Sequence, residues 1–214
     1  YTRAYTTEVV QGKHGVKITS HASVVAETVQ KILDVTITWK IEAAGKIDAD
    51  IAVTKDDEFP DLPRFGVRMF LDKKLSAVRY FGMGPQESYC DKHQAASHGL
   101  YQANVDDLHE DYIRPQENGS HYDCEYVELN NSRYGIVVSA ENAFSFNASY
   151  YTQEELEEKT HNYELTESDS VVFCVDYALN GIGSNSCGPV VLEQYRFDDV
   201  LFRFQFTLIP YVKG

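Results

Sequence analysis

The chain has 214 residues and a formal net charge of −14, from 33 acidic and 19 basic residues. This surplus repels phosphate groups, so we expect no nucleic-acid partner and no anionic membrane. No run reaches the ~18 apolar residues of a membrane-spanning helix, and the start lacks a signal-peptide pattern. These features predict a cytoplasmic protein.

Composition and cysteine usage point to a single reduced β-domain over residues 1–214. Aromatic residues make up 13% of the chain, with 15 Tyr and 11 Phe, and aromatic side chains favour strands. A chain of this length has room for one domain with a sizeable core. The four cysteines show no metal-ligand spacing. We interpret them as reduced thiols, with Cys90, Cys124 and Cys174 buried and Cys187 in a loop.

The first part of the chain has the two-residue period of strands. From Val35 to Ile41, apolar residues alternate with Thr36, Thr38 and Lys40, which predicts a strand with one buried and one exposed face. A solvated loop is expected over 55–63. The predicted strands are Thr2–Gln11, Gly15–Glu27, Val29–Ala43, Ile47–Thr54, Arg64–Leu71 and Ser76–Phe81.

The middle of the chain is more polar. Two glycines and Pro85 interrupt the strand pattern in Gly82–Asp91. The spacings of the histidines that follow fit no standard metal site. Further on, Asn118–Gly119 predicts a tight hairpin, because a type I′ turn needs positive φ at both central residues. The three histidines are His93, His98 and His109.

The second half predicts more strands, one helix and one unusual loop. Thr152 and Glu155 have the spacing of a capping box, so Thr152–His161 is the single helix candidate. Gly181–Pro189 contains three glycines, two serines, an asparagine and a proline. Such a segment is an exposed loop, either a plain turn or a functional one. The predicted strands are His121–Asn130, Tyr134–Ser139 and Phe144–Ser149. The loop is expected to lie between strands, with Val171–Tyr177 before it and Val190–Tyr195 and Tyr195–Pro210 after it.

Many short strands with frequent turns predict an all-β sandwich with one short helix. In their order, Gly82–Asp91, Arg114–Gly119 and the loop with its flanks resemble the C-terminal domain of the β-galactosidases of glycoside hydrolase family 2. The likeness covers roughly Pro63–Pro210. It implies a large antiparallel β-sandwich of the supersandwich type found in galactose mutarotases. The family domain opens with an Arg-Ala-Pro-Thr-Asp-Asn type stretch that is absent here, so the resemblance implies that the first strands are missing.

The resemblance also implies a function. It suggests a non-catalytic C-terminal domain or small subunit of an enzyme that removes terminal β-D-galactose from galactosides such as lactose. In that family the catalytic glutamates and the magnesium and sodium ligands lie in a barrel domain. This chain has no alternation of strands and helices, so we expect no catalytic residue, metal or cofactor in it. The implied partners are the remaining domains or large subunit, the galactoside, and further copies in an oligomer.

The same resemblance places the loop in the substrate pocket, with Ser184, Asn185, Ser186 and Cys187 as candidate residues. Some family members have Trp at the position of Cys187, where its ring stacks on sugar. A thiol cannot stack, although it can line a pocket wall. Asn185 and Ser186 have two alternative roles, hydrogen bonding to sugar hydroxyls or, as we favour, to their own loop.

Two alternatives stay open. Glu87 and Asp91 either contact sugar or, as we favour, hydrogen-bond within the protein. The whole chain is alternatively a stand-alone carbohydrate-binding or mutarotase-like module. Mutarotation needs a histidine acid and a glutamate base that face one sugar. The candidate pairs are His121 with Glu117 and His161 with Glu164.

Overall fold

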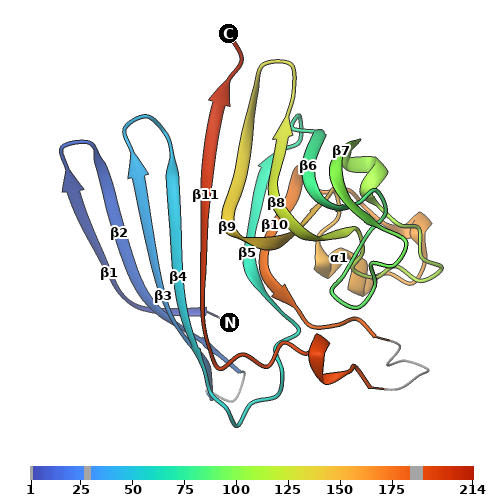
Figure 1. Cartoon of the computed structure of the whole chain (residues 1–214), viewed down its shortest axis with the longest axis horizontal. Coiled ribbons are helices and arrows are strands. Elements are labelled where there is room, and N and C mark those ends of the chain that lie inside the picture. Colours follow the sequence, from blue (N-terminus) through green and yellow to red (C-terminus); the bar gives the residue numbers. More distant parts are fainter. Residues whose placement is uncertain (1, 27–29, 184–189) are drawn as a thin grey trace.

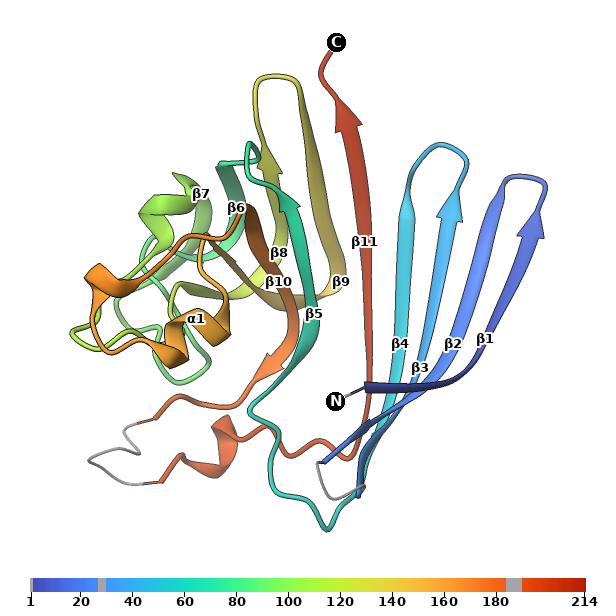
Figure 2. The ribbon, with the colours of Figure 1, turned by 180° about the vertical axis from the view of Figure 1, so that it is seen from behind.

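The computed structural model describes residues 2–26, 30–183 and 190–214. In this part of the chain, eleven strands form one hydrogen-bonded sheet (Figures 1 and 2). All the strand pairs are antiparallel. The strands are β1 Thr2–Gly12, β2 Gly15–Val25, β3 Lys31–Glu42, β4 Ile47–Lys55, β5 Arg64–Asp72, β6 Ala77–Gly84, β7 Ser97–Asn104, β8 Ser120–Asn130, β9 Tyr134–Ser149, β10 Ser170–Leu179 and β11 Leu201–Val212.

The sheet forks at β9. The first part of this strand, up to Ser139, pairs with β11, whereas Ser145 to Ser149 pair with β10. On its other side β9 pairs with β8 along both parts. Two groups of strands therefore leave the same side of β9: β11 continues through β4 and β3 to β2 and β1, and β10 continues to β5. We call the part of β9 between Ser139 and Ser145, where β9 pairs with neither β11 nor β10, the fork.

The two groups pack against each other through aromatic rings. Phe202 of β11 lies 5.0 Å from Phe65 of β5 and 4.7 Å from Tyr177 of β10, measured between ring centroids. On β11, Phe202, Phe204 and Phe206 are buried, and the residues between them face the opposite side because side chains alternate along a strand. One buried cluster joins both groups. The fold is therefore sandwich-like although its strands form one sheet.

Helices are few and short. The predicted helix is confirmed as α1 Gln153–Glu158, and Thr152 Oγ1 accepts a hydrogen bond of 3.1 Å from the Glu155 amide at its start. The 3-10 helices within residues 2–26, 30–183 and 190–214 are η1 Val105–Leu108, η2 Asn162–Glu164 and η3 Glu193–Tyr195. No helix in these ranges has both the length and the apolar character needed to cross a membrane.

The predicted all-β, antiparallel fold with one short α-helix is confirmed, but three local predictions are wrong. The two strands expected over 134–149 form the single strand β9. Strand β7, which contains His98, lies where no strand was predicted. Asn118–Gly119 closes no hairpin, because β7 and β8 both pair with β6. Only Gly119 has positive φ, while the Asn118 side chain binds backbone groups of Glu110 and Gln116.

Two further expectations concern the cysteines and the sheet edge. Cys124 and Cys174 are buried free thiols and Cys90 is partly buried; burial raises the pKa of Cys174 to about 11. Every residue of β1 is exposed, and β1 pairs only with β2. The strand thus forms an uncovered edge of the sheet.

Candidate functional site

The predicted pocket residues Ser184, Asn185, Ser186 and Cys187 lie outside the described residues, so their predicted roles stay predictions. The chain on both sides of them is described. It leaves the sheet at the end of β10 and returns through η3 to β11. We call residues 179–183 the outgoing limb and residues 190–200 the returning limb, and their contacts define how the loop is anchored.

Asp91 anchors the outgoing limb. Its carboxylate accepts hydrogen bonds from the amides of Ile182 (3.1 Å) and Gly183 (2.6 Å). Gly183 has φ 53, a conformation that glycine adopts at little cost. At Gly181, a Cβ atom would lie 2.9 Å from Asp91 Oδ2 and 2.8 Å from a methyl of Val191. A glycine is needed here because the two limbs and the carboxylate approach so closely.

Backbone hydrogen bonds join the outgoing and returning limbs. The Gly181 amide donates to the Tyr195 carbonyl at 2.8 Å. The Phe197 amide donates to the side chain of Asn180 at 2.9 Å. The Cys90 thiol lies between the limbs, 3.7 Å from the Leu179 carbonyl oxygen and 3.8 Å from that of Tyr195. The loop therefore starts and ends at a fixed base.

Glu87 is the centre of a buried hydrogen-bond network and is 9% exposed. One carboxylate oxygen accepts bonds from Lys92 Nζ and Tyr112 Oη; the other accepts from the Gly119 amide at 2.8 Å and Tyr89 Oη at 3.3 Å. Burial opposes ionisation, but these hydrogen bonds outweigh it and lower the pKa of Glu87 below its usual value. The contacts favour hydrogen bonding within the protein over contact with sugar.

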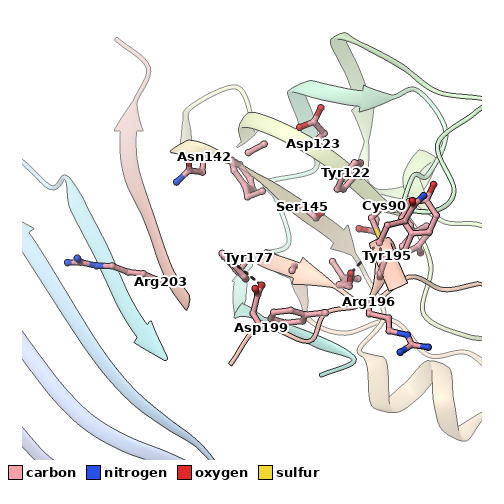
Figure 3. Close-up of a pocket in the computed structure, with 18 residues that line it drawn as sticks. Cys90, Tyr122, Asp123, Asn142, Ser145, Tyr177, Tyr195, Arg196, Asp199 and Arg203 are labelled. Carbon is pink, nitrogen blue, oxygen red and sulfur yellow. Dashed lines mark hydrogen bonds between the residues drawn. The ribbon is translucent and has the colours of Figure 1, made fainter. Parts of the chain in front are cut away.

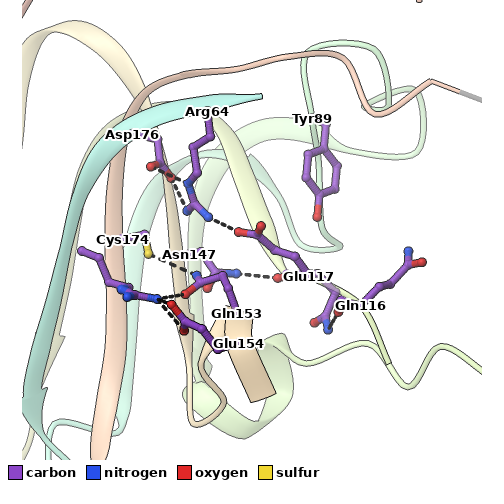
Figure 4. Close-up of polar contacts among 12 residues, drawn as sticks. Arg64, Tyr89, Gln116, Glu117, Asn147, Gln153, Glu154, Cys174 and Asp176 are labelled. Carbon is purple, nitrogen blue, oxygen red and sulfur yellow. Dashed lines mark hydrogen bonds and ion pairs between the residues drawn. The ribbon is translucent and has the colours of Figure 1, made fainter. Parts of the chain in front are cut away.

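A second buried carboxylate, Asp176, is held by an arginine (Figure 4). Arg64 donates to both oxygens of Asp176, at 2.8 and 2.6 Å, and also to Glu117. Asp176 is 1% exposed. A bidentate pair of this kind is geometrically specific. The pair joins β5 to β10, and the contact of Arg64 with Glu117 adds the segment before β8.

The contacts give no support to the mutarotase-like acid and base pairs. His121 is 1% exposed and lies between the rings of Tyr80 and Phe146. Burial lowers its pKa to about 4. Its proposed partner Glu117 binds Arg64 instead. In the second pair, His161 Nδ1 lies 3.6 Å from Glu164 Oε2, but the same oxygen accepts hydrogen bonds of 3.0 Å from the Thr160 and His161 amides, so the carboxylate caps η2.

The three histidines considered as a metal site, His93, His98 and His109, bind different groups. His93 Nδ1 lies 3.0 Å from the Tyr89 carbonyl and His98 Nε2 lies 3.1 Å from that of Asp123. His109 faces Asp111. In the part of the chain that the structure describes, no group of three or more His, Cys, Asp or Glu residues has the arrangement of a metal site.

A pocket of about 450 Å³ lies at the fork, beside the base of the loop (Figure 3). We call it the fork pocket. It is lined by Asn142 to Ser145 of β9, by the end of β10 and by residues 194–197. Its β8 wall contains Asp123, which has φ 55 at an irregularity in the pairing of β8 with β9. The sequence alone does not predict this pocket, because its walls come from segments that are far apart in the chain.

The family model described as "Beta galactosidase small chain" matches residues 2–208. The chain belongs to this β-galactosidase family. Its curated relatives include the β-galactosidases of Actinobacillus pleuropneumoniae, 47% identical over 209 residues, and Staphylococcus xylosus, 36% identical over 207 residues. These matches cover 98% and 97% of this chain but 20% and 21% of the relatives. The chain thus spans about a fifth of the β-galactosidases that it matches.

A further relative is the β-galactosidase of Kluyveromyces lactis, 32% identical over 168 residues, or 77% of this chain and 16% of that protein. Among solved structures, an aldose epimerase homologue from C. elegans has a TM-score of 0.45 and 9% identity, and the match covers 98% of this chain and 69% of that one. At these values the structural likeness carries no argument about function.

The anchoring role of Asp91 predicts a local effect of Asp91→Ala. Without the carboxylate, the amides of Ile182 and Gly183 lose their acceptor, so their hydrogen exchange should become faster. The free energy of unfolding should fall by only about 1 kcal/mol. NMR-detected exchange measures the first effect and urea denaturation the second. The control Asp57→Ala changes an exposed turn residue; equal exchange rates at the two amides in all three proteins would contradict the anchor.

The lowered pKa of Glu87 predicts a pH-dependent effect of Glu87→Gln. The ionised carboxylate contributes stability above its unfolded pKa of about 4.3, and this contribution disappears as the pH falls through the lower folded pKa. The substitution should therefore cost about 2 kcal/mol at neutral pH and less in acid. Urea denaturation at pH 7 and in acid measures both values. The exposed Glu125→Gln is the control; an equal cost of Glu87→Gln at both pH values would disprove the role of the charge.

Proposed function

We propose that this chain is a non-catalytic part of a β-galactosidase that hydrolyses terminal β-D-galactose from galactosides such as lactose, in the cytoplasm. In this proposal the residues Ser184–Cys187 contribute to the substrate pocket of the barrel-bearing remainder. Two findings together carry the proposal. The family model matches nearly the whole chain, and the chain spans only about a fifth of the length of the relatives. Magnesium and sodium would belong to the remainder of the enzyme.

The carboxylates near the loop support a non-catalytic role. Glycoside hydrolysis generally needs one carboxyl group as acid and another as nucleophile or base, both facing the substrate. Glu87 is bound by four donors, Asp91 by two loop amides, and Asp176 by Arg64. These groups are engaged in holding the fold together. Their arrangement favours catalysis on another part of the enzyme.

The anchored base of the loop supports its role in a pocket. A loop that presents side chains to substrate needs fixed ends, because a small displacement of a contacting group weakens binding. Here Asp91, Cys90 and the Gly181–Tyr195 hydrogen bond fix both ends. The sequence at positions 184–187 adds hydroxyl, amide and thiol groups.

Exposed apolar side chains support docking against the remainder of the enzyme. Ile182, Val190 and Leu192 are 44%, 73% and 62% exposed on the two limbs of the loop. Ile113 and Tyr163 are 98% and 82% exposed on neighbouring segments, which are joined by a hydrogen bond of 3.0 Å from the Asn162 side chain to the Tyr112 carbonyl. Ile182, Val190 and Leu192 line one hollow of the surface, and exposed apolar groups that lie together are typical of an interface.

Replacement of the matching part of a relative tests the assignment. The Actinobacillus pleuropneumoniae β-galactosidase without the segment that matches this chain should not cleave a chromogenic β-galactoside, and neither should this chain alone. A hybrid in which this chain replaces that segment should be active. Activity of this chain by itself would show that its own carboxylates catalyse hydrolysis. A hybrid that folds but is inactive would contradict the proposal that this chain is a part of a β-galactosidase.

The place of the loop can be tested with Cys187→Trp in the hybrid. An indole ring stacks on sugar where a thiol does not, so the substitution should change the ratio of transfer to hydrolysis more than the rate of hydrolysis. Product analysis at high lactose measures this ratio. Val190→Trp, which adds the same ring outside Ser184–Cys187, is the control. An unchanged ratio in Cys187→Trp would place the loop outside the pocket.

A further inference from the structure

The fork pocket has the size of a small-ligand site and a structural reason to exist. Its volume of about 450 Å³ lies within the usual range for such sites. It forms where β9 has lost β11 and not yet gained β10, so no strand fills this part of the sheet. The floor is β9 and the walls come from β8, from β10 and from the returning limb of the loop (Figure 3).

Two buried serine residues line this pocket. Ser145 of β9 is 5% exposed and Ser120 of β8 is 3% exposed. Ser120 Oγ is fully shielded and has no hydrogen-bond partner among the described residues. Ser145 Oγ makes no hydrogen bond within the same ranges, but it is not fully shielded. Buried polar groups are nearly always paired, because an unmade hydrogen bond costs free energy. Such groups point to a hydrogen-bonding occupant.

Tyrosine adds both hydroxyl groups and ring faces. Tyr122 lines the pocket beside Ser145, and its hydroxyl also lacks a partner among the residues that the structure describes. Burial, and then the charge of Asp123, raise the pKa of Tyr122, so the hydroxyl stays protonated and able to donate. Tyr177 and Tyr195 form further walls. Aromatic rings with polar groups at their edges suit a ligand that has both C–H faces and hydroxyls.

The charges of the pocket favour a neutral ligand. The carboxylates of Asp123 and Asp199 lie in its lining. The two arginines of the lining face other carboxylates: Arg203 donates to Asp50 at 2.6 Å, and Arg196 Nε lies 4.0 Å from Asp61 Oδ2. The uncompensated charge is therefore negative, which repels phosphate and carboxylate groups.

We propose that the fork pocket is a binding site for a neutral monosaccharide, with Ser145 and Tyr122 as hydrogen-bonding residues and tyrosine rings as walls. The lining residues that define this site all belong to the described part of the chain, and Ser184–Cys187 are not used to define it. The binding of sugar to this chain and its contribution to a β-galactosidase are separate properties, so each is tested independently.

The test is titration of the whole 214-residue chain, labelled with ¹⁵N, with galactose, glucose and galactose 6-phosphate. We expect saturable shifts of amide signals around Ser145 and Tyr122 with at least one neutral sugar, and weaker binding of the phosphate. Tyr122→Phe and Ser145→Ala each remove one unpartnered hydroxyl, so the fold should persist while affinity falls roughly threefold to tenfold. The controls Tyr126→Phe and Ser139→Ala make the same changes on the same strands outside the pocket.

Three results would overturn the proposal. The first is no saturable binding of either neutral sugar to the folded chain. The second is that Tyr122→Phe and Ser145→Ala bind the sugar with the same affinity as the two control variants. The third is tighter binding of galactose 6-phosphate than of galactose, which would contradict the charge argument. Activity of the hybrid enzyme enters none of these outcomes, so they are independent of the proposed function.

Discussion

The structure depends on one constraint, the pairing of β9 with three strands. An antiparallel strand has two edges, so a third partner must share one edge with another. β11 and β10 share that edge of β9 in succession, and β11 and β10 each continue into further strands. Because the two groups start at different points of one strand, they can turn toward each other and pack Phe65, Phe202 and Tyr177 against one another. The same constraint leaves the fork open.

Buried polar groups divide into two kinds around this fork. Glu87 and Asp176 have donors for both carboxylate oxygens, so they fix the segments before β8 against the sheet. Ser120 and Ser145 have none among the described residues. Satisfied groups specify one arrangement of the chain, whereas unsatisfied groups in a pocket leave hydrogen-bonding capacity for a ligand. Hydrogen-bond satisfaction thus separates polar residues with a structural role from candidates for ligand binding, even where the two kinds are close in the sequence.

The base of the loop is fixed by residues from three separate segments of the chain. Asp91 comes from the segment after β6, Gly181 from the end of β10 and Tyr195 from η3, and they meet at one point. The loop that they hold leaves the sheet without changing it. Function can thus be added to a rigid fold by a loop, which is consistent with membership in a β-galactosidase family whose members are about five times longer.

The sequence by itself determined the all-β class, most strands, the capped helix and the family, because these depend on local periodicity, capping residues and motif order. It did not determine that 134–149 is one strand, since the fork is decided by which strands compete for its edge. It predicted a hairpin at Asn118–Gly119, but tertiary contacts of Asn118 with Glu110 and Gln116 prevailed. Only the tertiary structure decided the anchor at Asp91 and the fork pocket. The anchor joins residues that are more than 90 positions apart, and the pocket has walls from several strands.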